Sequence, residues 1–218
     1  SCKGISANIT KDEDITKILQ YVQQEYDNLH ILVNCAGKSD RGALLNTSPD
    51  KFLSLFELNF LGTVRCVNAF APYIIKNKGH IINIGSLAAK TAGKWMGAYS
   101  VSKFAVSAYS QQLRLELKTS EVHVLLVCPG PIKRDNPRLY EFDNTDNIPE
   151  SAKKPGGGVK TKTIDPYWLA QKILQYTKLR KPELIIPQKT KILFAIQQIS
   201  PTLADWIIHT DESLEDTR

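Results

Sequence analysis

Apolar residues along this chain gather in compact runs that alternate with long amphipathic segments. Compact runs cover residues 29–33, 80–84 and 122–128, and each is typical of a strand buried in a parallel sheet. Residues 49–77 and 97–118 are predicted helices, the first with Ser48 and Pro49 as its N-cap and first residue. Strands that alternate with long helices predict an α/β fold, with a parallel sheet covered by helices.

Residues near the two ends of the chain predict further elements. Residues 2–8 favour a short strand, and the pattern Thr10-Lys-Asp-Glu13 predicts a capping box that opens a helix. The apolar stripe of this helix consists of Ile15, Ile18, Leu19, Val22 and Tyr26. Later in the chain, Asp165 and Pro166 cap a helix that reaches about residue 179, and residues 184–186 predict a short strand.

Two regions fall outside this alternation. Residues 131–163 contain charges, prolines and a triple glycine at 156–158, and they exceed the usual loop length, which favours a substrate loop. Residues 188–209 form an apolar tail broken at Pro201, for which core packing, partner contact and docking on a membrane surface all stay open. No internal repeat or second domain is evident, so residues 1–218 are interpreted as a single partial domain.

The composition is that of a soluble globular protein. The 218 residues are 42% hydrophobic and 23% charged, with a net charge of +6. The basic excess lies between residues 151 and 195, where only Asp165 and Glu183 oppose the lysines and arginines. No zinc-finger spacing or RNA-binding signature accompanies them, so nucleic-acid binding is not predicted. A solvated basic face is one interpretation, and contact with an anionic substrate or membrane surface is the other.

The cysteines and histidines favour neither disulfides nor a metal site. Cys2, Cys35, Cys66 and Cys128 are far apart, and the last three lie in apolar settings, as reduced and mostly buried thiols do. The four histidines are equally scattered, so no metal site is predicted. No apolar run reaches transmembrane length. We therefore expect a cytoplasmic protein, with peripheral membrane contact as the open alternative.

The strongest chemical signal is Tyr99-Ser-Val-Ser-Lys103, with Ser86 thirteen residues before the tyrosine. Positions i and i+4 share one face of a helix, so the phenol of Tyr99 and the ammonium of Lys103 are expected side by side. At roughly 4 Å and an effective dielectric constant of about 20, the cation favours the phenolate by about 4 kcal/mol. That energy is enough to bring the pKa of a tyrosine from about 10 to about 7. Such a tyrosine can act as general acid or base toward an alcohol or a carbonyl group.

Three polar or glycine-bearing segments follow the ends of predicted strands. They are residues 34–37, Ser86, and Pro129 with Gly130. Ligands of parallel α/β sheets bind beyond the carboxyl ends of the strands, so these segments are expected to converge on one rim. Their convergence favours a catalytic site over the chance occurrence of a Tyr-x-x-x-Lys pattern.

At these positions the chain resembles the short-chain dehydrogenase/reductase family. The matching residues, in order, are Asn34-Cys-Ala-Gly37, Asn59 in Leu58-Asn-Phe-Leu-Gly62, Ser86 after Asn83-Ile-Gly85, Tyr99-Ser-Val-Ser-Lys103 and Pro129-Gly-Pro-Ile132. The resemblance implies a Rossmann-like, doubly wound parallel sheet in three α/β/α layers. It also implies NAD(P)-dependent oxidation of an alcohol or reduction of a carbonyl compound. The two long helices resemble those through which family members form dimers and tetramers, so a homo-oligomer is expected.

The resemblance carries specific roles onto this sequence. Tyr99 would be the proton donor or acceptor, and Lys103 would hold the nicotinamide ribose and lower the pKa of Tyr99. Ser86 would hydrogen-bond the substrate oxygen, and Asn59 would anchor a water in a proton relay to Lys103. The other residues implied to contact NAD or NADP are Asn34, Ala36 and Gly37 on the adenine-ribose side and Pro129, Gly130 and Ile132 beside the nicotinamide.

Three departures from the family pattern change the expectation. The glycine-rich turn after the first strand and the first two strands are absent, so the resemblance begins at the family's third strand. Asn8 stands where an Asp usually contacts adenine, but its amide still offers a donor and an acceptor, so it is expected to contact the cofactor. Arg134 stands where a threonine near the nicotinamide amide is common. We therefore expect these residues to be a truncated piece of an enzyme, inactive alone and weak in nucleotide binding. The alternative is a cofactor-free binding or scaffold protein.

Overall fold

The computed structural model describes residues 2–135 and 162–213, with side chains described as far as residue 208. Its helices are α1 (Asp12–Glu25), α2 (Pro49–Phe56), α3 (Gly62–Lys76), α4 (Tyr99–Glu116), α6 (Pro166–Lys178), α7 (Thr190–Ile199) and α8 (Pro201–Ser213). Its strands are β1 (Ile31–Asn34), β2 (His80–Ile84), β3 (His123–Pro129) and β4 (Glu183–Ile186). Most of the predicted substrate loop, residues 136–161, lies outside the described residues.

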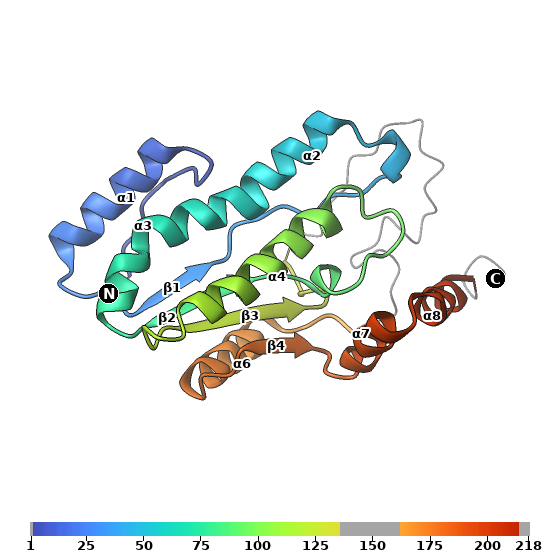
Figure 1. Ribbon diagram of the computed structural model, residues 1–218. Helices are drawn as coiled ribbons and strands as arrows, with labels where there is room; N and C mark the ends of the chain where they lie inside the picture. Colours follow the sequence, from blue (N-terminus) through green and yellow to red (C-terminus); the bar gives the residue numbers. More distant parts are fainter. Residues whose placement is uncertain (1, 136–161, 214–218) are drawn as a thin grey trace.

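The four strands form one parallel sheet in the order β1-β2-β3-β4. Helices α3 and α4 cover one face of the sheet, and α6 covers the other (Figure 1). This arrangement confirms the predicted α/β class and its three layers. The predicted strands at residues 29–33, 80–84, 122–128 and 184–186 all have counterparts, with bounds that differ by at most two residues.

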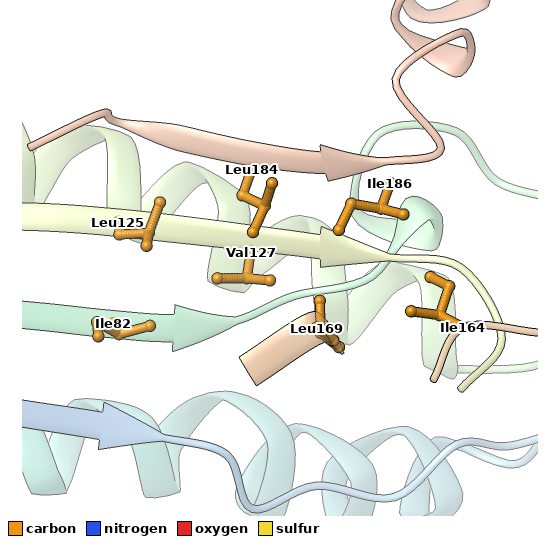
Figure 2. Close-up of a cluster of buried hydrophobic side chains, with 7 residues drawn as sticks. All are labelled: Ile82, Leu125, Val127, Ile164, Leu169, Leu184 and Ile186. Atoms are coloured by element: carbon orange, nitrogen blue, oxygen red, sulfur yellow. The ribbon is translucent and has the colours of Figure 1, made fainter. Parts of the chain in front are cut away.

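The hydrophobic core lies on both faces of the central strand β3. On one face, Leu125 and Val127 belong to a buried cluster with Leu169 of α6 (Figure 2). On the other face, Val124 packs in a cluster with Val67 of α3. Every residue of β3 is buried, as expected for a strand with helices on both sides.

β1 is one of the two edge strands of the described sheet, and its Ile31 and Val33 side chains are 41% and 49% exposed. The predicted strand over residues 2–8 is wrong, because these residues are exposed and take no regular structure. A strand needs a neighbour to take its backbone hydrogen bonds, and β1 pairs only with β2 among the described strands. Cys35, expected to be buried, is exposed for a related reason, because it follows this open edge strand.

Two predicted helix starts are confirmed by their hydrogen bonds. Ser48 Oγ accepts the N–H of Lys51 at 3.3 Å, and a proline follows it at the first helical position. Asp165 Oδ1 accepts the N–H of Trp168 at 2.8 Å in the same way. The predicted helix over residues 49–77 consists of α2, a π-helical turn over Glu57–Leu61, and α3.

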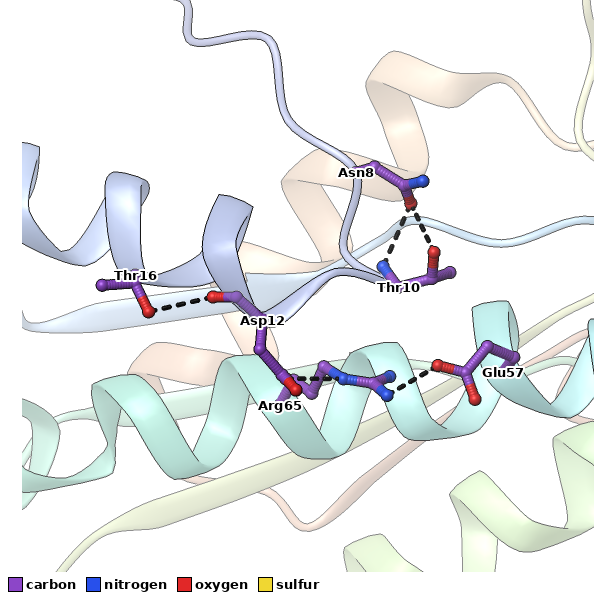
Figure 3. Close-up of polar contacts among 6 residues, drawn as sticks. All are labelled: Asn8, Thr10, Asp12, Thr16, Glu57 and Arg65. Carbon is purple, nitrogen blue, oxygen red and sulfur yellow. Dashed lines mark hydrogen bonds and ion pairs between the residues drawn. The ribbon is translucent and has the colours of Figure 1, made fainter.

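The start of α1 differs from the predicted capping box. The helix begins at Asp12, and Thr10 donates its hydroxyl to Asn8 Oδ1 at 2.9 Å instead of capping it (Figure 3). Arg65 of α3 then donates its Nε to Asp12 at 2.9 Å and pairs with Glu57 at 2.6 Å. These contacts attach α1 to the helical segment that contains the π-helical turn.

Three junctions between a helix and the following strand contain a charged residue with a left-handed backbone. Lys78 before β2, Glu121 before β3 and Arg180 before β4 have φ angles of 48°, 55° and 48°. Glycine is the usual residue where a helix ends in this conformation, because a side chain there is strained. Exposed ion pairs, such as the one between Lys78 and Glu121, contribute little to stability. The stability of the fold alone therefore does not account for charged residues at all three positions.

The apolar tail forms α7 and α8, which continue from the carboxyl end of β4 (Figure 1). Phe194 packs against the buried cluster beneath α4, and Ala204 is fully buried. Ile199 and Trp206 stay exposed at 85% and 63%. Part of the tail thus packs on the core, while partner contact and membrane docking remain predictions. Within the described residues, no helix has the length and apolar character needed to cross a bilayer.

Candidate active site

The carboxyl ends of β1 and β2 bring two of the predicted segments to one rim. Asn34, the last residue of β1, lies opposite Asn83 of β2 and donates its Nδ2 to Asn83 Oδ1 at 2.8 Å. The N–H of Gly85, next to Ser86, donates to the carbonyl oxygen of Val127 at 2.7 Å and so extends the pairing of β2 with β3. The residues that follow these parallel strands therefore share one edge of the sheet, as the sequence predicts.

Tyr99 and Lys103 lie four positions apart at the start of α4. Lys103 is only 6% exposed, and its Nζ donates to the carbonyl oxygen of Ile84 at 2.9 Å. Burial lowers the pKa of Lys103 to about 8, against a smaller raising effect of the Cys35 and Cys128 thiols. The amine is therefore mostly protonated at neutral pH and is held at the carboxyl end of β2.

Ser86 follows β2 and caps the short 3-10 turn Leu87–Ala89. Its Oγ accepts the N–H of Ala88 at 3.1 Å. A hydroxyl that accepts this bond still has its proton to donate to another oxygen. The half-buried side chain is thus a fixed donor at the same strand end that binds Lys103.

Asn59 connects the loop after β1 to α4 from within the π-helical turn, where it is 1% exposed. Its Oδ1 accepts the N–H of Lys38 at 2.8 Å, and its Nδ2 donates to the carbonyl of Lys38 and to Ser102 Oγ, both at 2.9 Å. Ser102 Oγ in turn donates to the carbonyl oxygen of Tyr99 at 2.7 Å. The Asn59 side chain therefore positions Tyr99 relative to the rim, and its role in holding a relay water stays a prediction.

Gly37 packs closely beside Asn59 and Lys103. A Cβ atom added to Gly37 would lie 3.0 Å from Asn59 Oδ1 and 3.4 Å from Lys103 Nζ, so a side chain here would displace these two groups. Ile84 takes one of the three N–H groups of Lys103, which leaves two for the hydroxyls of a ribose. These residues fit the nicotinamide-ribose part of a dinucleotide.

Gly130 and Ile132 form the other side of the rim, after β3. The N–H of Gly130 donates to the carbonyl oxygen of Ile186 at 2.8 Å, and a Cβ added to Gly130 would lie 3.4 Å from that oxygen. Ile132 pairs with Ile164 in an isolated bridge. Gly130 thus stays attached to the end of β4, and Ile132 adds an apolar side chain next to it.

Asn8 and Arg134 are not connected to the rim by any contact between described residues. The Asn8 side chain accepts from Thr10 (Figure 3). Its N–H donates to Asp14 at 2.6 Å, so its described bonds serve the start of α1. Arg134 is exposed. Among the described residues, no glycine-rich turn opens a helix directly after a strand, where a pyrophosphate would bind. The described residues of the rim therefore fit only the nicotinamide end of a dinucleotide.

Two fully buried serines of α4, Ser102 and Ser110, are absent from the predicted site residues. Ser110 Oγ accepts from Asn83 Nδ2 at 2.9 Å, and Asn83 accepts from Asn34, so a polar chain crosses from β1 to α4 behind the rim. Two asparagines at equivalent strand ends are the signal in the sequence that could have indicated this chain.

Comparisons with known proteins find relatives of similar sequence. Residues 1–140 match the family model described as short chain dehydrogenase. The chain is 30% identical over 212 residues to the "Probable short-chain type dehydrogenase/reductase VdlC" of Helicobacter pylori, covering 92% of this chain and 78% of that protein. It is also 30% identical to the "Dehydrogenase/reductase SDR family protein 7-like" of Drosophila melanogaster, covering 90% of this chain and 58% of the relative.

A solved structure shares the fold. It is a short chain dehydrogenase/reductase from Burkholderia phymatum in complex with NAD, and the two structures match with a TM-score of 0.79. The match covers 92% of this chain and 76% of that one, at 20% sequence identity. At this level of sequence identity, the similarity shows only that the two proteins share the same arrangement of sheet and helices.

Proposed function

The chain belongs to the short-chain dehydrogenase family of oxidoreductases, and on this premise we propose that it uses NAD or NADP to interconvert an alcohol and a carbonyl compound. Tyr99 is the general acid and base in this proposal. The observation that supports it most strongly is the buried ammonium of Lys103, bound to Ile84 two residues before Ser86. Gly37 packs directly beside this ammonium, where a Cβ atom would come within 3.4 Å of it. A scaffold protein without a cofactor would not need a charge buried at the end of this strand.

The side chains at the rim divide the proton chemistry between them. In the direction of reduction, Ser86 donates its hydroxyl to the substrate carbonyl oxygen and polarises the bond. Tyr99 transfers its phenolic proton to the same oxygen as negative charge develops there. Lys103, protonated at neutral pH, stabilises the phenolate that remains. In the direction of oxidation, the phenolate takes the proton of the alcohol.

The cofactor, when bound, supplies or accepts the hydride. Lys103 would hold the ribose hydroxyls through the two N–H groups that Ile84 does not use. Asn34, Ala36 and Gly37 would line the adenine-ribose side, and Pro129, Gly130 and Ile132 would flank the nicotinamide. NAD and NADP both remain in the proposal.

The proposal is tested on the protein encoded by the complete gene. Reduced NAD or NADP is mixed with the protein and a panel of aldehydes and ketones, and the loss of reduced nicotinamide is followed together with the formation of alcohol. Equal amounts of oxidised nucleotide and alcohol are expected with at least one carbonyl compound. Binding of the nucleotide without turnover of any compound in the panel would support the scaffold alternative instead.

The 218 residues on their own are expected to bind NADPH more weakly than the micromolar range. The described residues provide groups for the nicotinamide end, but no glycine-rich turn at a helix N-terminus for the pyrophosphate. Isothermal titration of NADPH into this chain measures the affinity. A dissociation constant in the micromolar range or tighter would show that the chain has another way to hold the phosphates.

We further propose a homo-oligomer formed through α2, the π-helical turn and α4. A groove of about 570 Å³ on α2 and the π-helical turn is lined mainly by apolar side chains, among them Phe52, Leu53 and Leu61. Leu53 is 68% exposed, and Phe104 of α4 is 39% exposed. Light scattering is expected to give a multiple of the monomer mass, and Leu53→Asp is expected to lower it. A monomeric mass for the unchanged protein would exclude this interface.

A further inference from the structure

A second cluster of charged side chains lies at the amino ends of the strands, whereas Tyr99 lies near their carboxyl ends. It surrounds an open pocket of about 510 Å³ at the amino ends of β3 and β4. β3 has seven residues, so about 20 Å of strand separates this pocket from the candidate active site. The charged side chains that line it are Lys78, Arg114, Lys118, Arg180 and Glu121.

Arg180 ties three junctions of the fold together at this pocket. Its guanidinium donates to the carbonyl oxygens of Lys78 and Glu121, which precede β2 and β3. Lys78 forms an ion pair with Glu121, so the one carboxylate among the lining residues already has a cation. These are the three charged residues with left-handed backbones. Strained positions of this kind point to a role for the side chains beyond folding.

Arg114 and Lys118 supply two further cations at the C-terminal end of α4. Neither forms a side-chain hydrogen bond or ion pair with another residue that the structure describes. Glu121 is paired with Lys78, so no carboxylate of the pocket neutralises them. A bound anion would neutralise the cations of Arg114 and Lys118.

The helix ends around the pocket offset only part of its positive charge. Basic side chains are common at helix C-termini, because each helix end carries about half a negative charge. The ends of α3, α4 and α6 together would contribute about −1.5 charges. The lining side chains carry four positive charges and one negative charge, so a positive excess remains.

The histidine that lines the pocket is already engaged within the protein. His123 Nδ1 lies 3.0 Å from His80 Nδ1, and His123 Nε2 lies 2.8 Å from the carbonyl oxygen of Lys181. No group of three metal-ligating side chains occurs among the described residues. The pocket therefore offers ammonium and guanidinium groups to a ligand and no metal site.

We propose that this pocket binds a phosphate-bearing anion, as a second site separate from the catalytic rim. Arginine and lysine side chains from different elements suit the several oxygens of a phosphate. Val122 and Pro182 add an apolar wall against which an organic group can pack, and the volume is that of a small-molecule site. A soluble phosphorylated compound and a lipid headgroup present the same chemistry, and the experiment separates them.

Thermal unfolding with inorganic pyrophosphate tests the site. Pyrophosphate at roughly ten times its dissociation constant is expected to raise Tm by about 3 °C, and sodium chloride at equal ionic strength is not. The double variant Arg114→Gln, Lys118→Gln breaks no described bond, so it should keep the Tm of the free protein and lose the shift. The matched control, Lys11→Gln at the N-cap of α1 with Lys17→Gln on α1, should keep the shift.

Arg180→Gly is a second variant with a distinct expectation. Glycine fits the left-handed backbone at this position, so the protein should fold while its shift with pyrophosphate is lost. Vesicles that contain phosphatidic acid, compared with pure phosphatidylcholine, identify the source. Binding that the double variant loses indicates a headgroup, and a pyrophosphate shift alone indicates a soluble ligand. The site is refuted if neither probe has an effect beyond that of salt, or if the double variant keeps the shift.

Discussion

Tyr99→Phe is expected to lower kcat of the full-length gene product by about 10³-fold, and to leave its affinity for the nucleotide nearly unchanged. The change removes one hydroxyl and keeps the ring, so α4 and its bonds to Ser102 and Asn59 stay in place. The loss corresponds to general acid–base catalysis by a single positioned group, which contributes about 10²–10⁴-fold.

Tyr109→Phe provides the matched control on the same helix. Burial raises the pKa of Tyr109 to about 12, so this phenol keeps its proton at neutral pH and should not take part in turnover. The steady-state rate of reduction and the dissociation constant of the nucleotide are measured for both variants. Equal rates in the two variants would remove Tyr99 from the mechanism.

Lys103→Met is expected to make the protein more stable at neutral pH and to abolish its turnover. A pKa of about 8 instead of 10.5 corresponds to a penalty of about 3 kcal/mol on the charged form of the buried amine. The variant loses the hydrogen bond to Ile84, worth about 1 kcal/mol, so a net gain of about 2 kcal/mol is expected. That gain corresponds to an increase of about 4–8 °C in Tm. Stability given up at a functional site in this way is a common cost of activity.

The burial penalty on the charged Lys103 amine also predicts how the stability of the protein changes with pH. Between pH 8 and 10.5 the unfolded chain binds the Lys103 proton and the folded chain releases it, so stability rises with pH there. Below pH 8 both states bind the proton, and the penalty stays constant. Lys103→Met should remove the rise, and Lys17→Met, at an exposed position of α1, should keep it. A Tm of Lys103→Met below that of the unchanged protein at pH 7 would contradict the burial of a charged amine.

Features of the fold that are set by residues close together in the sequence could be predicted from the sequence. β2 and β3 are continuous apolar runs, because helices cover both faces of the sheet. The caps at Ser48 and Asp165 need only the N–H three residues later. The carboxyl-end rim follows from the parallel direction of the strands, which places Asn34 beside Asn83.

Features that are set by contacts between residues far apart in the sequence could not be predicted from the sequence. Residues 2–8 have the composition of a strand, but pairing needs a neighbour that the described sheet does not provide. The three bonds of the Asn59 side chain join it to Lys38 and Ser102, which lie far away in the sequence. The charged pocket at the amino ends of the strands combines residues from three separate junctions.

We propose that Lys103 activates the phenol of Tyr99 for proton transfer. The most direct measurement is an ultraviolet titration of that phenol, taken as the difference between the unchanged protein and Tyr99→Phe across the alkaline range. We expect a pKa of Tyr99 clearly below the ordinary value of about 10, and a return to about 10 or above in Lys103→Met. A Tyr99 that titrates at 10 or higher in both proteins would contradict it.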